Sequence, residues 1–214
     1  MYIVLEGLDG AGTTTQAQAL GQALRDRGVD VLLLAEPSDA SVGNLIRQAL
    51  RGRWVHRDGR AIDDATLALL FAADRLDLAS EKIAPALARG QWVISDRSYV
   101  SSLAYQSAAD PTLLPWLATL NAKMLRPDLL FAFRVDVQTC LRRLRARDGE
   151  QQAELYEVPE RLAEVERAYD RVFASVRERE PDLVVVDVDA SVSRQDVLAQ
   201  LMRAIDGVTA GKGP

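Results

Sequence analysis

A glycine-rich loop near the N-terminus is the first group of residues whose spacing suits a chemical role. The stretch from Gly7 to Thr14 reads GLDGAGTT, so Gly7 and Gly12 have the GxxxxG spacing, and it follows the apolar segment YIVLE. Glycines let backbone N–H groups converge on a phosphate, and the positive end of a following helix faces the same anion. The Thr14 hydroxyl would then reach a magnesium ion. A glycine-rich turn without a ligand is the alternative, and the predicted strand and helix on either side favour phosphate binding.

Thr13 departs from this pattern, because a lysine is expected at its position in a phosphate-binding loop. The backbone cradle does not depend on that side chain. Transfer of a phosphoryl group, however, depends strongly on positive charge around the phosphates. The loop therefore predicts phosphate binding more firmly than catalysis, and a catalytic site would need a cation from elsewhere in the chain.

Charged residues also follow two other apolar segments. Asp96 and Arg97 come directly after WVIS at 92–95, and Glu36 follows DVLLLA at 30–35. The carboxyl ends of parallel strands share one edge of a sheet, where ligands gather. Asp96 could there organise magnesium or its water, and Arg97 could hold a phosphate through two hydrogen bonds. An isolated Asp-Arg pair is usually a surface ion pair, and it is the position at the strand end that suggests a site.

The composition limits the classes of function. The chain has 214 residues, 48% hydrophobic and 27% charged, which is typical of a soluble globular protein with a substantial core. A net charge of −5 argues against a nucleic-acid-binding surface but allows small anionic ligands.

The apolar runs are far shorter than the ~20 residues that span a bilayer, and no signal peptide is recognisable, so we expect a cytoplasmic protein without membrane contact. The single cysteine, Cys140, and the single histidine, His56, exclude an internal disulfide and a Cys/His zinc site; we expect Cys140 to pack and His56 to lie in a solvated loop.

Strand and helix patterns alternate along the chain. Apolar segments without regular polar alternation predict buried strands at 2–6, 30–35, 92–95, 129–135 and 183–188. Helical patterns lie at 14–27, 42–51, 63–89, 99–106, 113–125, 137–147, 159–179 and 193–205. This alternation predicts an α/β fold, a three-layer α/β/α sandwich around a five-stranded parallel sheet. We expect one domain over 1–208, with a lid at about 148–157, for which a solvated loop is the alternative, and a frayed tail at 209–214.

Further motifs follow the loop at fixed separations. The chain has GLDGAGTTT at 7–15, EPS at 36–38, FAADR at 71–75, DRSYVSSLAYQ at 96–106, RPD at 126–128 and RARDGEQQAELYE at 145–157. Together they resemble the thymidylate kinase family of P-loop nucleoside monophosphate kinases over nearly the whole chain. The separation of FAADR from DRxxxSxxAYQ is highly specific, whereas the glycine loop occurs in many nucleotide enzymes. The resemblance implies a P-loop NTPase fold with a short lid.

The resemblance also implies a role for each matching residue. Phe71 would stack on the thymine ring, Tyr105 would pack under the deoxyribose, and Ser101 and Gln106 would read the polar edge of the pyrimidine. Taken singly, Phe71 and Tyr105 suit a core as well, and Arg75 suits a surface pair with Asp77; the joint spacing favours the site. The other implied ligands are Arg47, Arg75 and Arg97 for the acceptor nucleotide and its phosphate, Asp9 and Glu36 for the sugar and magnesium-bound water, Thr14 and Asp96 for Mg²⁺, and Gly7, Gly10, Ala11, Gly12, Thr13, Thr14 and Thr15 for ATP.

The chain departs from the family pattern at several positions. Thr13 replaces the loop lysine, Leu155 replaces a common lid arginine, Ser98 stands where tyrosine or histidine is frequent, and EPSDASVG lacks the usual glycine pair. Two cations of the family are thus absent. Our hypothesis is that Arg147, with Arg143 or Arg145, supplies the missing charge; a solvated helix face is an equally good interpretation of these arginines. The catalytic candidates are accordingly Asp9, Arg97, Arg143 and Arg147.

The reaction that the resemblance implies is transfer of the ATP γ-phosphoryl group to dTMP with Mg²⁺, giving dTDP and ADP. Two alternatives remain open. Loss of the cations could leave a nucleotide-binding protein with weak transfer, or the acceptor could be another pyrimidine monophosphate. The family further implies a homodimer, formed through the third predicted helix and the helix beginning near Tyr99.

Overall fold

The computed structural model of the chain describes residues 1–148 and 155–211. Its centre is a five-stranded sheet in the order β2-β3-β1-β4-β5, in which every neighbouring pair is parallel. The register places Leu5 beside Asp96, so the carboxyl ends of β1 and β3 lie together. The five predicted strands are confirmed, with the bounds β1 (Tyr2–Glu6), β2 (Val31–Ala35), β3 (Trp92–Asp96), β4 (Leu129–Arg134) and β5 (Val184–Asp189).

The central strands are buried on both faces. Every residue of β1 is buried, whereas the edge strand β5 is largely accessible. Alternate residues of a strand point to opposite faces. Tyr2 and Val4 accordingly pack with Leu78 in a smaller apolar cluster, while Ile3 and Leu5 belong to the main core. Covering on both faces explains why these segments are apolar without alternation.

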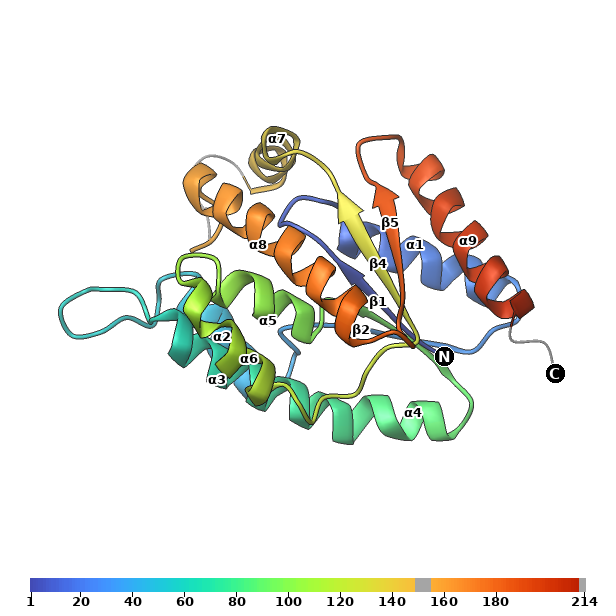
Figure 1. Cartoon of the computed structure of the whole chain (residues 1–214), viewed down its shortest axis with the longest axis horizontal. Helices are drawn as coiled ribbons and strands as arrows, with labels where there is room; N and C mark the ends of the chain where they lie inside the picture. Colours follow the sequence, from blue (N-terminus) through green and yellow to red (C-terminus); the bar gives the residue numbers. More distant parts are fainter. Residues whose placement is uncertain (149–154, 212–214) are drawn as a thin grey trace.

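Helices cover both faces of the sheet (Figure 1). On one face, α1 packs on α9 and on β1, β2 and β3; on the other, α5 packs on α8. The helix α3 contacts α2, α5 and α6. The helices are α1 (Thr13–Asp26), α2 (Ser41–Leu50), α3 (Asp64–Leu78), α4 (Ala84–Ala88), α5 (Tyr99–Gln106), α6 (Leu114–Leu120), α7 (Val137–Asp148), α8 (Pro159–Arg179) and α9 (Arg194–Gly211).

The helix predicted over 63–89 is interrupted. A π-helical segment, Ala79–Ile83, joins α3 to α4. Pro85 lies in the first turn of α4. Proline has no N–H to donate and its ring crowds the preceding turn, so the ordinary helical bonding pattern cannot pass through it. The helical periodicity of residues 63–89 gave no indication of this interruption.

Two other helix ends differ from the prediction. The helix predicted at 113–125 ends at Leu120, because the Asn121 amide donates to the Leu117 carbonyl at 2.8 Å and so caps the helix. The predicted tail at 209–214 is wrong over 209–211, since α9 continues to Gly211 with Val208 packed against the core. Residues 212–214, and 149–154 of the predicted lid, lie outside the described residues. No helix in the described part of the chain is long and apolar enough to cross a membrane.

Candidate active site

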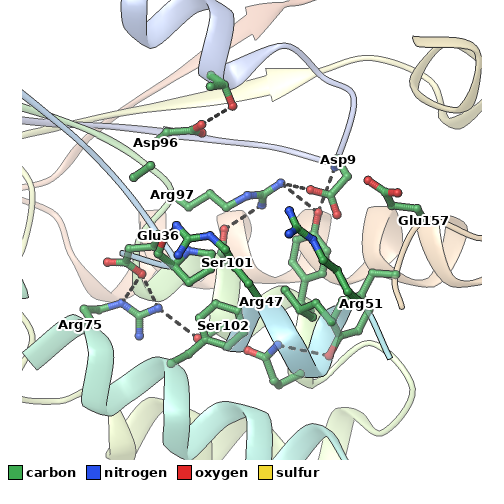
Figure 2. Close-up of a pocket in the computed structure, with 18 of the residues that line it drawn as sticks. Asp9, Glu36, Arg47, Arg51, Arg75, Asp96, Arg97, Ser101, Ser102 and Glu157 are labelled. Atoms are coloured by element: carbon green, nitrogen blue, oxygen red, sulfur yellow. Dashed lines mark hydrogen bonds and ion pairs between the residues drawn. The ribbon is translucent and has the colours of Figure 1, made fainter. Parts of the chain in front are cut away.

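A cavity of about 890 Å³ opens at the carboxyl ends of β1, β2 and β3. This is the edge at which α/β sheets bind ligands, and the volume suits a nucleotide-sized molecule. Figure 2 shows Arg47, Arg51 and Arg97 converging on the same space. The side chains that line the cavity are Asp9, Thr14, Ala35, Glu36, Pro37, Arg47, Leu50, Arg51, Arg53, Phe71, Arg75, Asp96, Arg97, Ser101, Ser102, Tyr105, Gln106, Arg147, Tyr156 and Glu157.

The glycine loop connects β1 to α1 beside this cavity. Gly10 has a φ of 83°, and a Cβ at this position would lie 2.6 Å from the Cys140 carbonyl oxygen of α7. Gly12 has a φ of 96° and is the residue before α1. Both positions therefore require glycine for their backbone conformation, and Gly10 also because α7 approaches so closely. The loop leads directly into the first turn of α1, whose N–H groups have no partner within the helix.

Thr14 and Asp96 meet where β1 and β3 end. The Thr14 hydroxyl donates a hydrogen bond to Asp96 Oδ2. Asp96 Oδ1 is buried and has no hydrogen-bond partner among the described residues. A hydroxyl next to a carboxylate with a free oxygen fits Mg²⁺, which takes one or two protein ligands and completes its shell with phosphate oxygens and water. The described residues contain no cluster of three or more His, Cys, Asp or Glu side chains that could hold a metal.

Arg97 connects the end of β3 to the glycine loop and to α5. Its φ of 79° lies in the left-handed region, which turns the side chain from β3 toward the glycine loop. Nη2 lies 2.5 Å from Asp9 Oδ1, and Nη1 donates to the Gly7 carbonyl at 3.0 Å. Tyr105 OH accepts from Nη2 at 3.2 Å and from the Asp9 backbone N–H at 3.0 Å. Arg97 and Tyr105 thus tie α5 to the loop.

Arg75 and Glu36 form a buried ion pair. Glu36 Oε2 accepts from Arg75 Nε at 2.8 Å and lies 2.6 Å from Nη2. Arg75 also donates to Asn121 Oδ1 at 2.6 Å and to Ser102 Oγ at 3.1 Å. Burial raises the pKa of Glu36 to about 7, against the opposing attraction of Arg75. Glu36 Oε1 is buried without a hydrogen-bond partner among the described residues, so the pair has an acceptor left for a ligand.

The base-binding candidates lie at the cavity wall formed by α3 and α5. Phe71 is half-buried and lines the cavity, and Gln106 is 1% exposed. Gln106 Oε1 has no hydrogen-bond partner among the described residues. Tyr105 packs edge-on against Tyr156, with ring centroids 5.1 Å apart. An aromatic face beside a buried amide is an arrangement that suits a flat base with polar edges.

The remaining arginines occupy different positions. Arg47 lines the cavity from α2 and donates to the carbonyls of Pro37 and Ser38. Arg147 lies at the rim, with a side chain that is 58% exposed and an ion pair to Glu157 at 2.9 Å. Arg143 lies outside the cavity lining and donates to the carbonyls of Ala11 at 3.2 Å and Ala190 at 2.9 Å. Arg145 is exposed. Arg47 and Arg147 therefore line the cavity, whereas Arg143 and Arg145 do not belong to its lining.

The model of the thymidylate kinase family matches residues 5–198. The chain belongs to the thymidylate kinase family. A "Probable thymidylate kinase" of Thermococcus onnurineus is 37% identical over 203 residues, which cover 93% of this chain and 96% of that protein. Another, from Pyrococcus horikoshii, is 37% identical over 209 residues, or 97% of this chain and 98% of that protein. The solved structure of thymidylate kinase from Candida albicans shares the fold, with a TM-score of 0.78 at 24% identity over 97% of this chain and 92% of that one.

The fold brings most of the residues that resemble the thymidylate kinase pattern to one place. All the predicted acceptor-side residues line the cavity, as do Asp9, Thr14, Asp96 and Arg147. Of the predicted ATP ligands, only Thr14 does so; the four residues Gly7, Gly10, Ala11 and Gly12 belong to the adjoining loop, and Thr13 and Thr15 to the first turn of α1. Thr13 itself is 5% exposed, and its side chain is packed into the first turn of α1. The roles of these residues remain predictions.

Several residues of the site were missed from the sequence. Ser102 Oγ accepts a hydrogen bond from Arg75, and the cavity is also lined by Arg51, at the end of the helix predicted at 42–51, and by Arg53. Tyr156 and Glu157 also line it; both lie in the motif ELYE, which was the available signal. Neither the exposed His56 nor the buried Cys140 takes part, as expected.

The predicted dimer surface needs a correction. All residues of α5, including Tyr99, are buried within the chain, so this helix has no face for a second copy. The third predicted helix, α3, exposes Leu69 and Leu76, which are 53% and 46% accessible.

Proposed function

We propose that the protein transfers the γ-phosphoryl group of ATP to dTMP, giving dTDP and ADP. The observation that carries the proposal is the cavity beside the glycine loop. Arginines from several elements line it together with an aromatic face and with residues whose buried acceptors have no partner in the described part of the chain. Guanidinium groups bind phosphate through paired hydrogen bonds, and a stacking face with a few directed polar atoms binds a base. Transfer then requires only positioning and charge stabilisation, with no covalent enzyme intermediate.

The acceptor nucleotide lies between α2, α3 and α5 in this proposal. Arg47 and Arg97 bind its phosphate, while Phe71 stacks on the thymine ring. Gln106 accepts a hydrogen bond from the base, and Arg75 with Glu36 closes the inner end of the cavity. Tyr105 fills the space beneath the sugar, where a 2′-hydroxyl would be crowded. These assignments are supported by the position of each side chain on the cavity wall.

The donor phosphates lie on the glycine loop and the first turn of α1. The loop supplies backbone N–H groups, and the positive end of α1 faces the same phosphates. Thr14 and Asp96 would hold Mg²⁺ directly or through water. When bound, the ion neutralises charge on the transferred phosphoryl group. The buried free oxygen of Asp96 supports this assignment.

We infer that Thr13 occupies the lysine position of the loop and contributes only its backbone N–H. Arg143 bonds to loop carbonyls and so restrains the loop. Arg147 lies at the cavity rim with a largely exposed side chain. We propose that Arg147 supplies the missing charge in the transition state. Arg147→Ala should then lower kcat by roughly tenfold or more while changing nucleotide affinity little. An unchanged kcat would exclude this role.

The decisive experiment measures ADP release from Mg-ATP with dTMP, dUMP, dCMP and dGMP as acceptors. Wild type and Thr13→Lys are compared under identical conditions. Turnover by wild type that is greatest with dTMP supports the proposal. If wild type binds dTMP in calorimetry but only the lysine variant turns over, the protein is a nucleotide-binding relative with weak transfer. If another pyrimidine monophosphate is preferred, the acceptor assignment is wrong.

Two further expectations belong to this proposal. A homodimer through α3 is supported by Leu69 and Leu76, which lie seven positions apart on the accessible side of the helix. Light scattering of wild type and Leu69→Glu would test it, since a charge at that face should yield a monomer. We further expect a cytoplasmic location, because nucleotide substrates of this class are found there.

A further inference from the structure

Glu6, the last residue of β1, is a buried carboxylate directly behind Arg97. It is 0% exposed and precedes the glycine loop by one residue. Its Oε1 accepts from Ser98 Oγ at 2.7 Å, and its Oε2 accepts from Ser101 Oγ at 2.6 Å and from Tyr169 OH at 3.0 Å. A charge so far from water is costly unless hydrogen bonds satisfy it. No step of the proposed reaction uses Glu6, so its presence needs another explanation.

The directions of these hydrogen bonds follow from Arg97. Its Nη1 donates to Ser101 Oγ at 3.1 Å and to Tyr169 OH at 3.2 Å. A guanidinium group can only donate, so both hydroxyls must turn lone pairs toward Arg97 and direct their protons away from it. The two hydroxyl oxygens also lie 3.0 Å apart. If one hydroxyl donates to the other, the second donates to Glu6, so the hydrogen-bond chain ends at the carboxylate in either case.

The third hydroxyl points the same way. Ser98 Oγ accepts from the Val100 N–H at 3.3 Å as the cap of α5, which leaves its proton for Glu6. Glu6 is thus surrounded by donors, as an ionised carboxylate requires. Burial raises the pKa of Glu6, and the bond from Ser101 and the charge of Arg97 oppose that increase.

We propose that Glu6 is a positioning residue for Arg97, which it orients through Ser101 and Tyr169. The carboxylate fixes the two hydroxyls so that their lone pairs hold the guanidinium at the cavity wall. Arg97 needs this support because its left-handed backbone is unfavourable for a residue with a Cβ, and because Asp9 attracts its other nitrogen. Ser101 consequently acts through Arg97 rather than on the base. The inference rests on the proposed function, in which Arg97 binds the acceptor phosphate.

The test compares two ligands that differ only in the phosphate. Calorimetry without ATP measures the Kd of dTMP and of thymidine for wild type, Glu6→Gln and Tyr169→Phe. The amide of Glu6→Gln has the size of the carboxylate but adds N–H donors, which force a hydroxyl proton toward Arg97. We expect roughly a tenfold loss of dTMP affinity in Glu6→Gln and a smaller loss in Tyr169→Phe. The affinity for thymidine should stay unchanged in both.

Ser98→Ala is the matched control. It removes a donor to Glu6 and the cap of α5 but touches neither hydroxyl that holds Arg97. It should lower the Tm and preserve the ratio of the two Kd values. The inference would be overturned if Tyr169→Phe and Glu6→Gln kept the wild-type ratio of the two Kd values. It would also be overturned if these variants lost affinity for dTMP and for thymidine equally. If Glu6→Gln does not fold, Tyr169→Phe decides. Failure of the proposed function is distinguishable, because wild type itself would then fail to prefer dTMP over thymidine.

Discussion

The side chain of Tyr156 sets the hydrogen-bonding direction of Gln106. Tyr156 OH donates to Asp64 Oδ1 at 2.5 Å and accepts from Gln106 Nε2 at 3.4 Å. The carboxylate can only accept, so the tyrosine proton is committed to it and a lone pair faces the amide nitrogen. The amide is thereby fixed with Nε2 toward Tyr156, and its buried Oε1 has no partner among the described residues. Because Gln106 lines the cavity, we expect this oxygen to act as the acceptor for the base.

This direction predicts which bases are accepted. Thymine and uracil carry a hydrogen on N3, whereas N3 of cytosine is itself an acceptor. Two acceptors facing each other in a buried site cost about 1–3 kcal/mol, which corresponds to roughly a 5- to 150-fold preference for dUMP over dCMP. Tyr156→Phe frees the amide to rotate and present Nε2. We expect the dUMP/dCMP ratio of kcat/KM to fall by about tenfold, mainly through better use of dCMP.

Steady-state kinetics with dUMP and dCMP at saturating Mg-ATP measure this ratio. Neither acceptor carries the methyl group of thymine, so the comparison reports only on the polar edge of the base. Arg161→Gln is the control. Arg161 also bonds to Asp64, through Oδ2, and its guanidinium lies 5.2 Å from the Tyr156 ring centroid. In the described part of the chain its hydrogen bonds go to Asp64 and Glu164 rather than to Gln106. The control should lower activity equally for both acceptors. An unchanged ratio in Tyr156→Phe, or an equal change in Arg161→Gln, would refute the reasoning.

Three other substitutions probe stability and the metal site. Arg75→Met should lower the free energy of unfolding, measured with denaturant, by about 3–5 kcal/mol, because Glu36 is left buried without its cation. Adding Glu36→Gln should restore part of this stability, and a double variant without any recovery would contradict the pairing. Asp96→Asn should raise the Mg²⁺ concentration for half-maximal activity by roughly tenfold while dTMP binding in calorimetry is unaffected. Asp63→Ala should cost about 1 kcal/mol by removing the cap of α3. The Thr66 backbone N–H lowers the pKa of Asp63, so this difference should be present above pH ~4 and shrink as the pH falls through the folded pKa.

The sheet could be predicted from the sequence because its signals are local. Each strand is a short apolar segment, and its charged end residues follow directly, as Asp96 does in β3. The helix boundaries that were missed depend on single side chains. Pro85 interrupts a periodic pattern that otherwise suggests one long helix, and Asn121 ends α6 by bonding to its backbone. The continuation of α9 to Gly211 depends on tertiary packing of Val208 against the core, which a local pattern does not show.

The sequence predicted most of the residues that line the cavity, but it did not predict the contacts among them. The positions of Glu36 and Arg97 directly after apolar segments predicted the edge of the sheet where the cavity opens, and the motif FAADR predicted Arg75 as a ligand. The sequence separation of their partners explains why the contacts were not foreseen: Glu36 lies 39 positions from Arg75, and Asp64 lies 92 positions from Tyr156. Arg143 shows the same limit, since its helical spacing with Arg147 suggested a shared role and the fold directs it to loop carbonyls instead. Such pairings arise from tertiary packing, which local patterns do not encode.

The distribution of charge explains how an acidic protein can bind a phosphorylated ligand without a lysine in its loop. Among the described residues, six arginines and four carboxylates line the cavity, an excess of two positive charges in a chain of net charge −5. This excess of positive charge lies in a concave site, so we expect it to attract a small anion rather than a nucleic-acid duplex. The arginines come from α2 and the segment that follows it, α3, the end of β3 and α7, so no single element supplies the charge. If Thr13 occupies the lysine position of the loop, as we infer, the absence of that lysine removes one of several positive charges around the cavity. Binding should then tolerate the absence better than transfer, which needs a charge at the reacting phosphate.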